Sequence, residues 1–208
     1  MKRRSNRLLP LELALLLALA ATAVWGAWSL GRQEDLSGRL IRLHVIANSD
    51  DAADQELKLQ VLDRVLQEAE AVLAGAGSRE EAERALTAAL PRLEDAAARE
   101  IAAQGAVFGV TASLERTAFP TRDYGTFALP AGEYTALRIV IGEGRGRNWW
   151  CVVFPPLCTA AATDLEETAV SFGLEQDDVE LMDAEEPAYV LRFRSLELWD
   201  MLRRWLGK

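Results

Sequence analysis

Histidine and cysteine are scarce in this chain, whose 208 residues include one histidine, His44, and two cysteines, Cys151 and Cys158. A zinc site would need further ligands beside His44, and no closely spaced Cys/His set is present, so we expect no metal ion and no cofactor. A cysteine with His44 as base would be the minimum set for thiol chemistry. However, both His44 and Cys151 lie in apolar strand segments, and apolar surroundings raise the pKa of a thiol. We therefore expect no catalytic residues and no enzyme.

The sequence also lacks phosphate-binding fingerprints and an excess of basic residues. No G-x-G-x-x-G segment opens a helix, and no Lys-Ser or Lys-Thr pair follows the glycine-rich stretch. The formal charge is −9, and because residues 1–30 hold four basic residues and one acidic residue, the rest of the chain carries −12. Nucleic-acid binding needs clustered lysine and arginine, so a nucleic-acid partner is not expected.

The first thirty residues have the pattern of a membrane-targeting segment. A basic opening, 1–7, precedes an apolar run, 8–30, which is interrupted by Pro10 and Glu12. Basic flanks stay in the cytoplasm, so the rest of the chain is predicted to lie outside it. Cleavage as a signal peptide and retention as a membrane anchor both stay open, as does a buried helix of a cytosolic protein. The predicted organisation is a leader at 1–30, a short linker at 31–38 and one exported domain at 39–208.

Hydrophobic periodicity predicts an α+β fold, in which an antiparallel sheet packs with two long helices and a C-terminal amphipathic helix. Residues 39–47 are a strand with two apolar faces, which indicates an interior strand. Helices are predicted from about 52 to 74 and from a capping box at Ser78 to about 104, the second kinked or split near Pro91.

The remaining elements are predicted to be mainly β. Short connections between successive strands favour an antiparallel meander. The acidic section 163–186 is expected to be partly helical. The predicted strands are 107–116, 134–141, 149–154 and 188–193, and the amphipathic helix begins at Ser195.

The block 142–158, GEGRGRNWWCVVFPPLC, concentrates three glycines, two tryptophans, two prolines and both cysteines of the chain. Its alternating glycines suit positive φ angles or a close approach to another surface, and we interpret them as a hairpin turn before an apolar strand. Two prolines end that strand. Outside the cytoplasm, Cys151 and Cys158 are a candidate disulfide that would clamp this corner; as an alternative, both are small buried apolar residues.

Four blocks of the sequence resemble the stage II sporulation protein R family. They are RLHVIANSD at 42–50, FPT and YG within 119–125, LPAGEY at 129–134, and the IGEG to FPPLC stretch at 141–158. The resemblance implies an intercellular signal of endospore formation, made in the forespore and exported into the septal intermembrane space. It also implies a partner, a membrane-embedded aspartic protease of the stage II sporulation protein GA type, which processes pro-sigma E in the mother cell.

We expect the partner to be bound by the glycine-rich block together with the strand and turn at 42–50. Tryptophan and arginine are common interface anchors, but adjacent strand residues point to opposite faces, so one tryptophan is equally a core residue. Two other function classes stay open: a thiol- or metal-dependent cell-wall hydrolase, and a wall-glycan binding module with stacked tryptophans. The candidate contact residues are Arg145, Arg147, Asn148, Trp149, Trp150, His44 and Asn48.

Overall fold

A computed structural model describes residues 8–125, 127–160, 165–172, 174–175, 178–179 and 182. The chain divides into two compact units, 1–36 and 37–208. The first unit holds most of helix α1 (Leu8–Arg39), so the segment expected as a linker is helical. Among the described residues, no helix is both long enough and apolar enough to cross a membrane.

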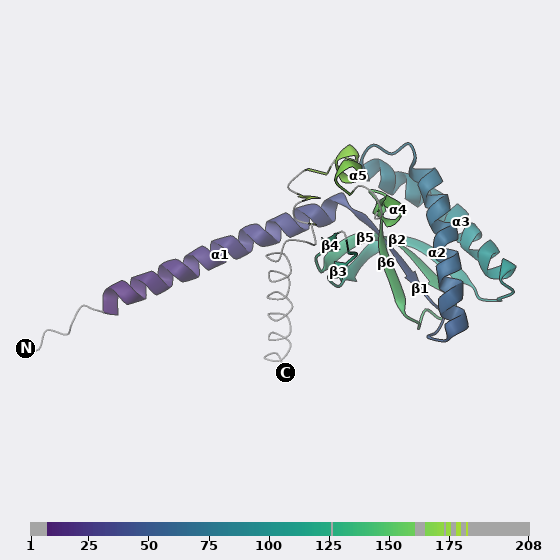
Figure 1. The fold of residues 1–208 in the computed structure, drawn as a ribbon, viewed down its shortest axis with the longest axis horizontal. Helices are drawn as coiled ribbons and strands as arrows, with labels where there is room; N and C mark the ends of the chain where they lie inside the picture. Colours follow the sequence, from purple (N-terminus) through teal and green to yellow (C-terminus); the bar gives the residue numbers. More distant parts are fainter. Residues whose placement is uncertain are drawn as a thin grey trace, which may run out of the picture. The chain divides into compact units, whose positions relative to one another are not determined.

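The second unit is built on a four-stranded sheet in the order β2-β5-β1-β6 (Figure 1). Strand β1 pairs in parallel with β5 and antiparallel with β6, and β2 pairs antiparallel with β5. The α+β class is therefore confirmed, with one parallel pair in the sheet. The strands are β1 (Ile41–Ile46), β2 (Val110–Phe119), β5 (Gly132–Ile141) and β6 (Asn148–Phe154).

The predicted meander is wrong in one respect, because β5 and β6 are not neighbours. Strand β1 lies between them, and all its residues are buried, which confirms the interior strand expected from its two apolar faces. Inserting β1 there buries both of its faces and gives its backbone a partner on each side. The glycine-rich segment is therefore not a hairpin turn but a connection that crosses from one side of β1 to the other.

Helices α2 (Ala52–Leu73) and α3 (Arg79–Ala103) pack on one face of the sheet (Figure 1). The capping box is present, since Ser78 Oγ accepts a hydrogen bond of 3.3 Å from the N–H of Glu81. Helix α3 continues through Pro91, where a kink or split was expected; burial of Leu86 and Leu93 on either side favours the continuous helix. The shared core includes Leu43, Val45, Val61, Val65, Leu137, Ile139 and Val153.

Smaller elements complete the described part of the second unit. Strands β3 (Arg122–Asp123) and β4 (Ala128–Leu129) form a two-stranded ribbon. Helices α4 (Leu157–Ala160) and α5 (Leu165–Ser171) follow β6. The predicted strand at 188–193 and the helix from Ser195 lie outside the described residues.

Candidate partner-binding site

Two segments far apart in the sequence form one structure at the end of the sheet where β1 ends (Figure 1). They are the turn 47–51 and the loop 142–148, which we call the tip. The turn accepts hydrogen bonds from four backbone N–H groups of the loop. These bonds run from Glu143 to Asn48 Oδ1 (3.0 Å), Arg145 to the Asn48 carbonyl (3.1 Å), Gly146 to the Ala47 carbonyl (2.9 Å) and Arg147 to Asp50 Oδ1 (2.7 Å).

Glycine is required in the tip because the two segments approach very closely. A Cβ atom at Gly146 would lie 2.1 Å from the carbonyl oxygen of Ser49. At Gly142, where φ is +58°, it would lie 2.2 Å from Asn48 Oδ1. Both reasons for glycine that the sequence suggested, positive φ and close approach, are therefore present.

Polar side chains beneath the tip hold its turn in place. Asp54 Oδ2 accepts hydrogen bonds from Ser49 Oγ (2.6 Å) and Asn48 Nδ2 (2.8 Å), and these bonds lower the pKa of Asp54. The buried ammonium group of Lys58 donates to the carbonyl of Arg147 at 3.2 Å, and burial lowers the pKa of Lys58. The side chain of Asn48, predicted as a partner contact, thus forms its hydrogen bonds within the tip and to Asp54 beneath it.

Four of the predicted contact residues are exposed, and one of them, Asn148, is described with His44 below. The side chains of Arg145 and Arg147 are 75% and 71% exposed, and Trp149 is 42% exposed. Arg145 pairs with Glu143, and Arg147 Nε lies 3.7 Å from Asp50 Oδ1. Exposed ion pairs contribute little to stability, so a partner can replace them at small cost.

His44, Asn148 and Trp150 form a second group on the sheet face opposite the helices. The buried ring of His44 stacks on Trp150, with centroids 5.8 Å apart, and its Nε2 lies 3.0 Å from Asn148 Oδ1. Trp150 is half-buried there, whereas Trp149 points to the other face, as strand alternation requires. The two tryptophans therefore do not form one platform on which a sugar could stack.

The pH dependence of stability should report on His44. Burial lowers the pKa of His44 below the ordinary 6.5, and the nearby charges of Arg138 and Arg42 lower it further. The hydrogen bond to Asn148 acts in the opposite direction and raises the pKa. The unfolded chain therefore binds a proton more readily than the folded chain. We expect the free energy of unfolding to fall as the pH decreases below about 6.5, by at most about 1.4 kcal/mol per pH unit.

Denaturant titrations between about pH 7 and pH 5 will measure this slope. His44 is the only histidine in the chain, so His44→Gln provides the control and should flatten the profile. An equally steep profile in the variant would assign the effect to other groups.

Cys151 of β6 and Cys158 of α4 form a disulfide, with Cα atoms 5.8 Å apart. In the chain-entropy model a loop of this length stabilises the fold by about 2 kcal/mol. Both cysteines are paired, so the structure offers no thiol for the hydrolase alternative. Within the described part of the chain, no cluster of three or more His, Cys, Asp or Glu residues could hold a metal ion.

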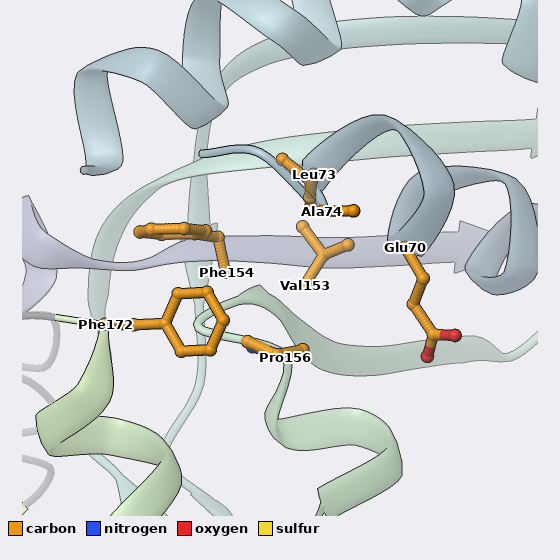
Figure 2. Close-up of a pocket in the computed structure, with 7 residues that line it drawn as sticks. All are labelled: Glu70, Leu73, Ala74, Val153, Phe154, Pro156 and Phe172. Carbon is orange, nitrogen blue, oxygen red and sulfur yellow. The ribbon is translucent and has the colours of Figure 1, made fainter. Parts of the chain in front are cut away.

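The corner that the disulfide closes contributes to an apolar pocket of about 340 Å³ (Figure 2). Phe154 and Pro156 line it together with Phe172, which follows α5. Figure 2 shows Glu70, the only charged side chain of the lining, at one side of the apolar group. The other lining residues are Leu73, Ala74 and Val153.

Arg42 lies fully buried on the sheet face opposite the helices, and it was not among the contact residues predicted from the sequence. Its guanidinium carbon is 4.1 Å from the ring centroid of Phe119 and 4.9 Å from that of Tyr134, and its Nη2 donates to the hydroxyl of Tyr124. Burial lowers the pKa of Arg42 and raises that of both tyrosines. The burial of Arg42 could have been inferred from its position within a strand that was predicted to be interior.

The family model described as Stage II sporulation protein R matches residues 37–164. A curated relative, Stage II sporulation protein R of Bacillus subtilis (strain 168), is 42% identical over 118 residues, which cover 57% of this chain and 53% of the relative. The chain thus spans about half the length of the curated relative that it matches. No solved structure matches. The family match includes the tip, the disulfide and the surroundings of Arg42.

Proposed function

The chain belongs to the stage II sporulation protein R family, and on this premise we propose that it is an exported signal that activates a membrane-embedded aspartic protease. In this proposal the protein is made in the forespore, and its N-terminal segment, cleaved or retained as an anchor, directs it into the septal intermembrane space. The protease, of the stage II sporulation protein GA type, then processes pro-sigma E in the mother cell. The protein acts as a ligand and not as an enzyme.

The tip is the observation that supports this proposal from the structure. Its backbone is held by hydrogen bonds on both segments, while Arg145, Arg147 and Trp149 remain exposed. A preorganised surface loses little conformational entropy on binding, and exposed arginine and tryptophan are frequent energetic anchors of interfaces. Such a ligand activates the protease by binding its active state more tightly than its inactive state.

Reconstitution tests the proposed function directly. The full chain is added to vesicles that contain the protease, on the membrane side opposite to pro-sigma E. We expect pro-sigma E cleavage to depend on the concentration of the chain and to reach saturation. A protease variant that lacks its catalytic aspartates provides the control. Cleavage at the same rate without the chain would refute the proposal.

A further inference from the structure

We propose that the sheet face opposite the helices carries a carboxylate-binding site formed by Arg42, Arg122 and Trp150. The proposal is independent of the tip, and it does not require the protease to be the partner. Three of the sequence blocks described above supply these residues, since 42–50, 119–125 and 141–158 meet on this face. The proposal rests on unpaired donors, on uncompensated charge and on the shape of the surroundings.

Four buried nitrogen atoms in this region carry N–H groups without a hydrogen-bond partner among the described residues. They are Nε and Nη1 of Arg42, Nε of Arg122 and Nε1 of Trp150. Buried N–H groups are nearly always paired in folded proteins. The other unpaired buried nitrogen of this group is Nδ1 of His44, whose Nε2 faces Asn148 Oδ1. Four unpaired donors indicate that an acceptor from outside the described residues completes the site.

The donors belong to one connected group of side chains. The guanidinium carbon of Arg122 lies 3.8 Å from the ring centroid of Trp150, and Trp150 in turn stacks on His44. The ring of Phe119 contacts both His44, at 5.8 Å between centroids, and Arg42, at 4.1 Å. Tyr124, which follows Arg122 closely in the chain, accepts a hydrogen bond from Nη2 of Arg42, and its ring centroid lies 6.0 Å from the guanidinium carbon of Arg42. These contacts place both arginines in one group of side chains on this face.

Among the described residues, no acidic side chain forms an ion pair with Arg42 or Arg122. Asp123, next to Arg122, accepts the N–H of Gly125 through Oδ1, and Glu115 pairs with Arg138 at 3.0 Å. The aromatic rings of Phe119 and Tyr134 stabilise the guanidinium of Arg42 at 4.1 and 4.9 Å from its carbon. A stacked guanidinium keeps its in-plane N–H groups free, and these match a carboxylate. Binding of an anion would satisfy both the charge and the donors.

The surroundings favour a carboxylate over a larger anion. Arg42 has no exposed surface, and the rings of Phe119, Tyr124 and Tyr134 surround its guanidinium. A carboxylate is planar and smaller than a phosphate, so it requires less displacement of the side chains around the buried guanidinium. Trp150 and Arg122 are only half-buried, which places the entrance at these two residues.

Titration of the full chain with sodium acetate, in an uncharged detergent and at constant ionic strength, tests the proposal. The readout is the ¹H–¹⁵N signals of the Trp150 indole and the arginine Nε–H groups. We expect saturable shifts with acetate and none with acetamide, its neutral counterpart. No saturable shift, an equal shift with acetamide, or tighter binding of inorganic phosphate than of acetate would each overturn the proposal.

A blocked peptide with one glutamate, compared with its glutamine counterpart, distinguishes the source of the carboxylate. If the glutamate peptide binds at least about tenfold more tightly than acetate and the glutamine peptide does not bind, the site takes an acidic side chain of a polypeptide. If acetate binds at least as tightly as the glutamate peptide, the ligand is a small free carboxylate. Both results uphold the site.

Variants at the entrance separate the site from the stability of the fold, since a change at the buried Arg42 can prevent folding. Arg122→Gln is expected to weaken acetate binding about tenfold, and Trp150→Phe, which keeps a ring beneath Arg122, about threefold. Arg99→Gln, on the exposed face of α3, is the control and should bind acetate unchanged. Equal affinity in all three variants and the parent chain would overturn the assignment.

Discussion

The double substitution Arg145→Ala/Arg147→Ala is expected to reduce activation of the protease about 100-fold and to leave the free energy of unfolding within about 0.5 kcal/mol of the parent chain. The two residues contribute to the fold through backbone N–H groups, which bind Asn48 and Asp50 and which alanine retains. Their side chains are mostly exposed, so the substitution removes charge without creating a cavity. The measurements are the concentration of the chain that gives half-maximal cleavage of pro-sigma E, and equilibrium denaturation.

A matched control removes the same charge from another surface. Arg84 and Arg99 are exposed on α3, and Arg84→Ala/Arg99→Ala should activate the protease as the parent chain does. Equal losses in the two double variants would show that net charge, and not the tip, determines activation. Full activity of both would exclude Arg145 and Arg147 from the interface.

Gly146→Ala is expected to lower the free energy of unfolding by about 3 kcal/mol. Its Cβ would lie 2.1 Å from the carbonyl oxygen of Ser49, and the backbone of the turn cannot yield without breaking the hydrogen bond from Gly146 to Ala47. The loop must therefore separate from the turn 47–51. Chemical denaturation of the variant and the parent chain measures the difference, and the reconstituted cleavage should decrease as well.

Gly75→Ala is the control for this effect. No atom lies within 4 Å of a Cβ built at Gly75, and its φ is not in the left-handed region. Alanine there should be neutral or stabilise the fold by up to about 1 kcal/mol, because it restricts the unfolded chain. A Gly146→Ala chain as stable as Gly75→Ala would mean that the loop and the turn are not in close contact in solution.

Local patterns in the sequence were sufficient to predict helices α2 and α3 and the interior position of β1. Helix α2 was expected from about 52 to 74 and spans Ala52–Leu73, and the capping box at Ser78 is present. The two apolar faces of 39–47 indicated an interior strand, which β1 is. These features depend on residues within one or two turns of each other, so periodicity and capping residues determine them.

The strands that pair with β1 and the segments that form the tip are determined by contacts between residues far apart in the chain. Periodicity shows that a strand is buried but not which strands lie beside it, so the insertion of β1 between β5 and β6 was missed. The burial of Arg42 was missed for the same reason, since Phe119, Tyr124 and Tyr134 reach it from other segments.

The sequence by itself determined that 142–146 needs glycine, that a helix follows β1 and that Cys151 and Cys158 are the only candidates for a disulfide. Only the tertiary structure decided that these glycines meet Asn48 and Ser49, that Trp149 and not Trp150 is exposed beside the tip, and that Arg42 is enclosed by aromatic rings. The physical reason is that local preferences act between near neighbours, whereas burial of the whole sheet selects which distant segments come into contact.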